Sequence, residues 1–160
     1  MSTLDAALPA APPLAGPPPR VLVVRAPYYR EVVDGLTRGA ERILDDAKAE
    51  RATLDVAGAF ELPQAIRIVV RGTARFDAFV ALGCIVRGET DHYDHICRET
   101  MAGMMAVALQ FGLALGTGLL TVDRIDQALA RSGQDGHNKG AEAAVAALMQ
   151  VAAARRFAAS

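Results

Sequence analysis

Two hydrophobic patterns alternate along the chain: short, continuous apolar runs, and longer segments with an apolar residue every three or four positions. The runs, rich in β-branched residues, are typical of parallel strands covered on both faces. The longer segments are typical of amphipathic helices. The patterns predict strands at 21–24, 53–57, 78–85 and 117–122. They predict helices at about 30–50, 64–72, 93–112 and 140–157, and a short helix capped by Asp123 and ending near Arg131.

The order of these elements is strand then helix, four times over, followed by a closing helix. This order indicates parallel strands joined by right-handed crossovers. We therefore expect an α/β domain of three layers, flavodoxin-like, with a four-stranded parallel sheet flanked by helices on both faces. A two-layer arrangement, with one face of the sheet left for a partner subunit, is the alternative. Ligands of such sheets bind at the carboxyl ends of the strands, where loops 25–29, 57–63, 86–93 and 122–123 should meet.

Composition predicts an N-terminal arm and limits the partners and the compartment of this domain. Residues 1–20 hold six of the eight prolines, so we interpret 1–19 as a flexible, Pro/Ala-rich arm and 20–160 as a single domain. A net charge of −1 does not favour nucleic acid as a partner, and the apolar runs are too short to span a membrane. The N-terminus lacks a secretion-signal pattern. Two cysteines are then most simply reduced thiols in the cytoplasm.

The segment from Gly88 to His95 concentrates the polar chemistry, because it joins a buried strand to a helix N-terminus. The backbone N–H groups of Gly88, Glu89 and Thr90, with the helix start, suit a small anion such as a phosphoryl group. His92, at the start of the helix, can move a proton near neutral pH, although a capping histidine is an equal alternative. His92, His95 and Asp94 also have a spacing that a metal site can use, but no third histidine follows at a suitable spacing, and the two cysteines do not form a Cys-x-x-Cys pair.

Other candidates lie in the neighbouring loops. Arg87, Arg131 and Lys139 are candidate counter-charges for an anion, with a solvated surface position as the alternative for each. Tyr28 and Phe60 end two strands, where an aromatic ring can stack on a flat ligand. For Phe60, core packing is an equal alternative. Glu61 is expected at a helix N-terminus close to the sheet edge.

Three motifs occur in a recognisable order. They are Gly58-Ala59-Phe60-Glu61-Leu62-Pro63, Gly83-Cys84-Ile85-Val86-Arg87-Gly88-Glu89-Thr90-Asp91-His92-Tyr93-Asp94, and Asn138-Lys139-Gly140-Ala141-Glu142-Ala143. Together, and over residues 21–157, the chain resembles the 6,7-dimethyl-8-ribityllumazine synthases. The resemblance implies a transferase that condenses 5-amino-6-(D-ribitylamino)uracil with 3,4-dihydroxy-2-butanone 4-phosphate, in the penultimate step of riboflavin biosynthesis. It implies no metal and no organic cofactor.

The resemblance also implies a role for each matching residue. His92 matches the family's proton-transfer histidine, and Gly88, Glu89 and Thr90 match its phosphate-binding turn, with Arg131 as the phosphate arginine. The resemblance implies that a further set of residues contacts the pyrimidine and its ribityl chain: Tyr28, Ala59, Phe60, Glu61, Cys84, Ile85 and Val86. Lys139 matches a lysine at the rim of the site. Thr117 stands where the family often has an aromatic that reaches a neighbouring subunit's site. The family forms pentamers, or multiples of pentamers, with sites between subunits.

Two other functions are alternatives for the same residues. A non-catalytic lumazine-binding or shell-forming relative would have no need of both His92 and Arg131. A metal-dependent hydrolase would use His92, His95 and Asp94, and would lose activity on chelation.

Overall fold

The architecture is seen in a computed structural model, which describes residues 9–134 and 137–158. Within these residues the strands are β1 (Arg20–Arg25), β2 (Glu50–Asp55), β3 (Ala78–Val86) and β4 (Ala114–Val122). The helices are α1 (Arg30–Asp46), α2 (Leu62–Arg71), α3 (His92–Phe111), α4 (Ile125–Ser132) and α5 (Lys139–Ala158), with a short 3-10 turn, η1 (Ala59–Glu61), ahead of α2.

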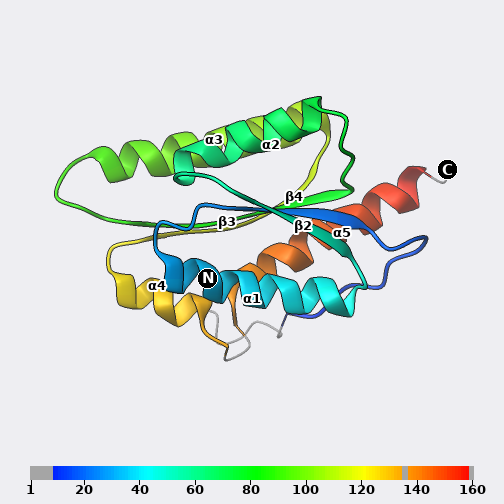
Figure 1. Ribbon diagram of the computed structural model, residues 1–160, viewed down its shortest axis with the longest axis horizontal. Helices are drawn as coiled ribbons and strands as arrows, with labels where there is room; N and C mark the ends of the chain where they lie inside the picture. Colours follow the sequence, from blue (N-terminus) through cyan, green and yellow to red (C-terminus); the bar gives the residue numbers. More distant parts are fainter. Residues whose placement is uncertain (1–8, 135–136, 159–160) are drawn as a thin grey trace.

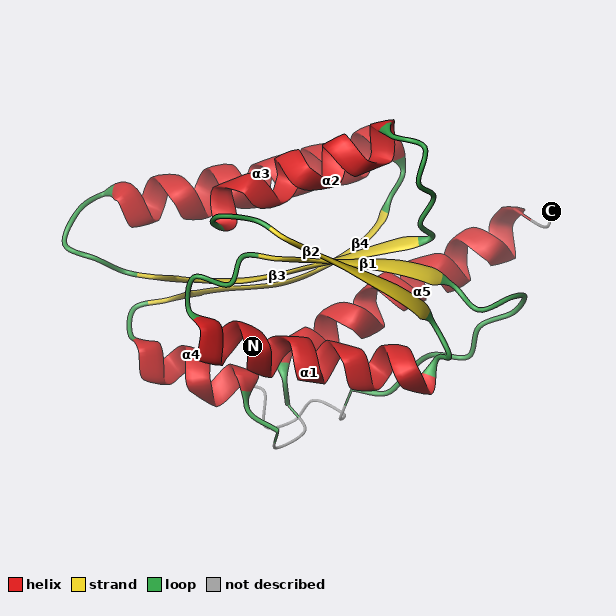
Figure 2. Cartoon of the chain, viewed as in Figure 1, coloured by secondary structure: helices red, strands yellow, loops and turns green. Residues whose placement is uncertain are grey.

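The four strands form one parallel sheet in the order β2-β1-β3-β4 (Figure 2). Arg25 pairs with Asp55 on one side and with Leu82 on the other, and Val86 pairs with Val122. The carboxyl ends of the strands therefore share one edge of the sheet, where the loops that follow them begin.

Helices cover both faces of the sheet. Helices α1, α4 and α5 lie on one face, and α2 and α3 lie on the other (Figure 1). Each interface has its own buried apolar cluster, one around Val21, Leu36 and Leu148 and the other around Val24 and Ile66. The predicted three-layer, flavodoxin-like fold is confirmed, and the two-layer alternative is wrong.

Helix α1 shows how the hydrophobic pattern builds one of these layers. Its predicted apolar stripe is buried up to Leu44: Val33, Leu36, Ala40, Ile43 and Leu44 are all 0% exposed, whereas Ala47, its predicted last member, is the C-cap residue and only partly buried. The expected end of this helix, near residue 50, is wrong. Lys48 takes a positive φ of 56°, which breaks the helix, and Glu50 already begins β2. Because β2 is an edge strand with mostly exposed side chains, its start carries no apolar signal.

Strand β4 is longer than its apolar run, because it begins at Ala114 rather than at Thr117. Its glycines allow α5 to pack close: the carbonyl group of Ala143 lies against Gly116, and that of Lys139 lies against Gly118. A methyl group at Gly116 would overlap the Ala143 carbonyl. Glycine in a strand interior often marks such a close approach of two backbones.

Helix α3 presents a different face to the core than its periodicity predicts. Thr100, Met104 and Val107 are its buried residues, whereas Met105 and Leu109, expected on the core face, are 61% and 75% exposed. These exposed side chains lie along a groove of about 510 Å³ beside the edge strand β4. The helix is apolar on more than one side, so its pattern alone did not distinguish the core from this groove.

The described part of the proline-rich arm lies against the domain. Leu14 packs on the core cluster of the α1 face, and Arg155 Nη1 donates to the carbonyl oxygens of Ala15 (2.7 Å) and Pro17 (2.8 Å). The flexibility of the arm and its boundary with the domain stay predictions, and residues 1–8 lie outside the described residues. None of the described helices is long and apolar enough to cross a bilayer.

Candidate active site

The carboxyl edge of the sheet holds the turns that the strand order brings together. The Ala26 N–H after β1 donates to the Leu82 carbonyl in β3 (2.9 Å), and the Arg87 N–H after β3 donates to the Val122 carbonyl in β4 (2.9 Å). These bonds extend the ladder past the strand ends. They fix the turns after β1, β3 and β4 side by side.

The turn from Gly88 to Asp91 connects β3 directly to α3. Asp91 is the N-cap residue, without a capping hydrogen bond from its side chain, and His92 is the first residue of the helix. The N–H groups of the first helical turn therefore face the turn, and the helix dipole favours an anion there. Gly88, Glu89, Thr90 and His92 are all exposed, so a ligand can reach them from solvent.

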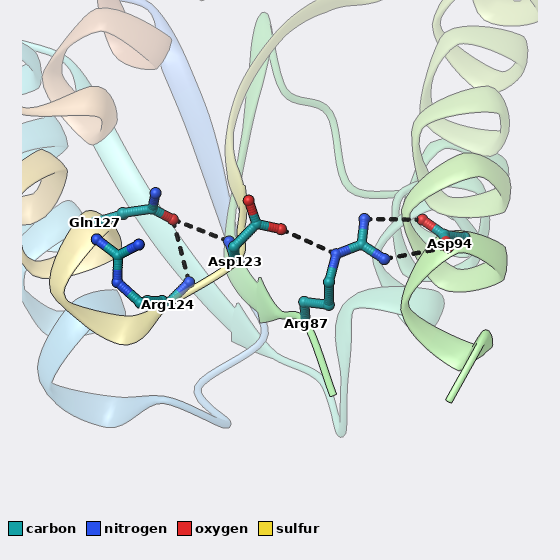
Figure 3. Close-up of polar contacts among 5 residues, drawn as sticks. All are labelled: Arg87, Asp94, Asp123, Arg124 and Gln127. Carbon is teal, nitrogen blue, oxygen red and sulfur yellow. Dashed lines mark hydrogen bonds and ion pairs between the residues drawn. The ribbon is translucent and has the colours of Figure 1, made fainter. Parts of the chain in front are cut away.

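Arg87 does not serve this turn as a free counter-charge, because two carboxylates already hold its guanidinium group (Figure 3). Its Nη1 and Nη2 atoms donate to both oxygens of Asp94, each at 3.2 Å, and Nε donates to Asp123 at 2.9 Å. The guanidinium also lies 4.2 Å from the centre of the Tyr93 ring. The hydrogen bonds that Arg87 donates to Asp94 first, and then to Asp123, raise the pKa of Arg87 above its usual range.

The network continues from Asp123 into helix α4. Gln127 Oε1 accepts hydrogen bonds from the N–H groups of Asp123 (2.9 Å) and Arg124 (3.1 Å), and the Gln127 carbonyl accepts one from Arg131 Nη1 (2.8 Å). The expectation that Asp123 caps this helix is therefore wrong. Arg124 is the N-cap residue, Gln127 bonds the free N–H groups, and the carboxylate of Asp123 pairs with Arg87 instead.

Two exposed aromatic side chains stand at the same edge, one in the turn after β1 and one in the turn after β2. Phe60, in η1, is 46% exposed, and Tyr28, after β1, is 76% exposed. Tyr28 packs edge-on against Tyr29, with ring centres 5.1 Å apart. Core packing, the alternative for Phe60, is wrong at that exposure. Ala59 and Glu61 flank Phe60 and are both partly buried.

The end of β3 contributes in two ways. Cys84 is 5% exposed and its side chain belongs to the core cluster of the α1 face, so it can meet a ligand through its backbone only. Burial raises the pKa of the Cys84 thiol to about 11, which keeps it protonated at neutral pH. Ile85 and Val86, the last residues of the strand, are only partly buried and lie next to the turn.

Three of the predicted site residues lie elsewhere in the same chain. Thr117 pairs with Ala81, five positions before the end of β4, or about 16 Å along the strand. Lys139 begins α5 beside Gly118, and its Nζ binds the Glu142 carboxylate at 2.6 and 2.8 Å. Arg131 is in the last turn of α4. The structure thus divides the predicted site residues into a large group that follows the strand ends at the carboxyl edge and a small group, on β4, α4 and α5, that does not.

The small group is held by Asn138, which is 3% exposed. Its Nδ2 atom donates to the carbonyl oxygens of Gly35 (2.9 Å), Ser132 (2.9 Å) and Gly133 (3.0 Å), and its Oδ1 atom accepts from the N–H groups of Gly140 (2.8 Å) and Ala141 (3.1 Å). One side chain therefore caps α5 and joins it to α1 and to the end of α4. It sets the positions of the neighbouring residues, Arg131 and Lys139.

The metal alternative is not supported by the geometry around His92. Asp94, its proposed third ligand, binds Arg87 through both carboxylate oxygens. Among residues 9–134 and 137–158, no group of three or more His, Cys, Asp or Glu side chains is placed to hold a metal ion.

The fold and the site define a flavodoxin-like α/β protein with a polar turn, at the start of a helix, beside an exposed histidine. The sequence pattern of the 6,7-dimethyl-8-ribityllumazine synthase family matches residues 18–155 of the chain. Proteins of that name are similar to it along most of their length. The one from Bartonella tribocorum is 40% identical, over 87% of this chain and 92% of the relative. Those from Paramagnetospirillum magneticum and Methylobacterium sp. strain 4-46 are 42% and 45% identical, over 86% and 88% of this chain and 96% and 80% of the relatives.

The chain therefore belongs to the 6,7-dimethyl-8-ribityllumazine synthase family. It is an enzyme of the transferase type, and the reaction implied by the sequence resemblance is the reaction of this family. That reaction joins 5-amino-6-(D-ribitylamino)uracil to 3,4-dihydroxy-2-butanone 4-phosphate and belongs to riboflavin biosynthesis.

The sequence did not predict that Asp123, Gln127 and Asn138 organise the site through their hydrogen bonds. Only the Asn138-Lys139-Gly140 motif gave a signal for one of them.

Proposed function

We propose that the condensation takes place at the carboxyl edge of each subunit, in a site completed by a neighbouring subunit. The observation that carries this proposal is the division of the site residues within one chain. Thr117 lies in the interior of β4, Lys139 begins α5 beside Gly118, and Arg131 is in the last turn of α4, so none of the three follows a strand end as the edge group does. A second copy of the chain would bring its own small group to the first copy's turn.

The phosphate of the butanone substrate would bind at the start of α3. The N–H groups of Gly88, Glu89 and Thr90 and the helix dipole favour a dianion at this position. A neighbouring subunit's Arg131 would add a cation, since one of its five N–H donors binds Gln127 and the others remain for an anion. Lys139, which shares its ammonium group with Glu142, would stand at the rim.

The pyrimidine would lie against the exposed aromatic side chains. Phe60 and Tyr28 offer ring faces to a flat heterocycle, which stacks well on aromatic groups. Ala59 and Glu61 would hold the ribityl chain. The backbone of Cys84 and the partly buried Ile85 and Val86 would contact the edge of the pyrimidine.

His92 would move protons during the reaction. The amine of the pyrimidine attacks the ketone carbon, and loss of water gives a Schiff base. Phosphate then leaves, and the second amine closes the ring with loss of a second water. Each step needs a proton taken from carbon or nitrogen, or delivered to a departing oxygen, and an exposed imidazole beside the phosphate turn can do both. Orientation of the two substrates supplies much of the remaining rate.

The groove beside β4 supports assembly into a ring. The described residues that line it include several exposed apolar side chains next to the edge strand, where unpaired backbone groups also favour a partner. The lining includes Met101, Met105, Leu109, Leu113, Leu115 and Thr117. A heterologous contact of this kind generates a ring where its rotation closes. We propose a pentamer, or a multiple of pentamers, that works in the cytoplasm.

Complementation between two inactive variants tests the shared site. His92→Ala and Arg131→Ala chains are each expected to be slow, because each site lacks one of the two groups. Co-expressed in equal amounts, they should regain activity, since roughly a quarter of the interfaces would join an intact His92 to a neighbour's intact Arg131. A mixture of His92→Ala with His92→Ala/Arg131→Ala chains is the matched control, because every site then lacks His92. If co-expression restores no more activity than the control, both residues act within one subunit and the proposal is wrong.

A further inference from the structure

Arg87 occupies the point where three elements of the active-site edge meet. It follows the last residue of β3, and its side chain reaches the first turn of α3 through Asp94 and the end of β4 through Asp123 (Figure 3). The turn 88–91, which carries the proposed phosphate-binding groups, begins at the residue after Arg87 and ends one residue before α3. Both ends of this turn are therefore attached to one guanidinium group.

The contacts of the Arg87 guanidinium are of a kind that restrains the position of the turn 88–91. The guanidinium is planar and rigid, and its two-pronged pairing with Asp94 restrains both distance and orientation. The guanidinium donates a third hydrogen bond, from Nε to Asp123. Its flat face lies over the Tyr93 ring. Gly88 has no atom within 4 Å of the position of a β-carbon, so packing around that residue does not hold the turn in place.

The same pairing also changes the charge around the turn. Glu89, Asp91, Asp94 and Asp123 place four carboxylates on this short stretch and at the end of the neighbouring strand. Arg87 binds two of them and turns their oxygens toward itself. Without Arg87, those two carboxylates would be uncompensated beside a site for a phosphate dianion, and like charges at such distances repel.

On this geometry we propose that Arg87 is a positioning residue for the condensation, which holds the phosphate turn in shape and keeps Asp94 and Asp123 from opposing the phosphate. Three of its five N–H donors are engaged on the two carboxylates, and this role needs no contact with the substrate. This role rests on the proposed binding of phosphate at the turn.

Arg51 offers a matched control at the opposite edge of the sheet. It also pairs with two carboxylates, Asp45 and Glu41 of α1, and its side chain is 34% exposed against 44% for Arg87. Arg51→Met and Arg87→Met thus remove the same groups from similar surroundings. Arg87→Lys keeps the charge but loses the two-pronged geometry, and serves where Arg87→Met fails to fold.

The experiment measures two properties of each variant: amide hydrogen exchange of segment 87–95, and kcat and KM for both substrates. For Arg87→Met we expect faster exchange in this segment and a KM for the butanone phosphate raised by about ten- to a hundredfold, because small displacements of a site cost up to about that much. The KM for the pyrimidine should change less. Arg87→Lys should be intermediate, and Arg51→Met should resemble the wild-type protein in both measurements.

The outcomes separate this inference from the function on which it rests. Unchanged exchange in Arg87→Met, or a KM for the butanone phosphate no higher than in Arg51→Met, would overturn the positioning role. A fall in kcat alone, in proportion to the fraction of folded protein, would equally overturn it. If the wild-type protein bound no butanone phosphate, the proposed phosphate site would fail, and the positioning role would fall with it. A change in exchange would then mark Arg87 as purely structural.

Discussion

Replacing Asn138 with alanine should destabilise the fold strongly, because the Asn138 side chain bonds to three helices at once. Loss of its cap on α5 costs about 1 kcal/mol. The buried carbonyl groups of Gly35 and Ser132 lose the hydrogen bond from Asn138, at about 1 to 2 kcal/mol each. The sum is about 3 to 5 kcal/mol, a large share of a typical folding free energy of about 5 to 15 kcal/mol.

Urea unfolding at a fixed protein concentration measures this loss. With a slope of about 2 to 3 kcal/mol per M, the midpoint should fall by about 1 to 2.5 M. Gln134→Ala is the matched control: its Nε2 also donates to the Gly35 carbonyl, but over 3.4 Å and from an exposed residue, so we expect a change within about 0.5 kcal/mol. Asn138→Asp should lower the urea midpoint about as much as Asn138→Ala, because a carboxylate keeps the acceptor but cannot donate to the carbonyls. Equal midpoints for Asn138→Ala and Gln134→Ala would refute the reasoning.

Two further predictions concern packing and pH. Gly140→Ala should destabilise the fold by about 3 kcal/mol or more, since the new methyl group would overlap the Leu36 carbonyl, whereas Gly88→Ala, in open space, should change the urea midpoint very little. Burial raises the pKa of the Cys84 thiol from 9.0 to about 11, so the folded state holds this proton more tightly. The protonated Cys84 thiol therefore contributes to the free energy of unfolding below about pH 9. This contribution should fall by about 2 to 3 kcal/mol as pH rises through 11. Cys84→Ala should show a smaller fall between about pH 8 and 10.5, and an identical fall would contradict the assignment.

The layers of the fold were predictable because burial leaves a periodic trace in the sequence. The stripe of α1 from Val33 to Leu44 and the apolar run of β3 are buried as their patterns predict. The misplaced boundaries fall where burial is weak or where glycine replaces side chains, at the exposed start of β2 and around Gly116 in β4. The core face of α3 was misjudged because its exposed methionines have the same hydrophobicity as buried ones.

The candidate site was predictable as a set of loops, but not as a set of contacts. Parallel strands joined by helical crossovers bring their carboxyl ends to one edge, which places Phe60 and His92 at the same edge. The pairing of Arg87 with Asp123 joins residues 36 positions apart, and the bond from Asn138 to Gly35 joins residues 103 apart. Side-chain pairings at such separations leave no periodic signal, so only the three-dimensional arrangement reveals them.

The formation of lumazine from its two substrates tests the central claim most directly. The purified protein is mixed with 5-amino-6-(D-ribitylamino)uracil and 3,4-dihydroxy-2-butanone 4-phosphate, and lumazine absorbance is followed beside an enzyme-free reaction and beside His92→Ala. We expect product well above the enzyme-free rate, with His92→Ala slower by about ten- to a thousandfold, in the range of a lost acid–base group. Wild-type protein that makes lumazine no faster than the enzyme-free mixture would contradict the assigned reaction, and an undiminished rate in His92→Ala would contradict the role of His92.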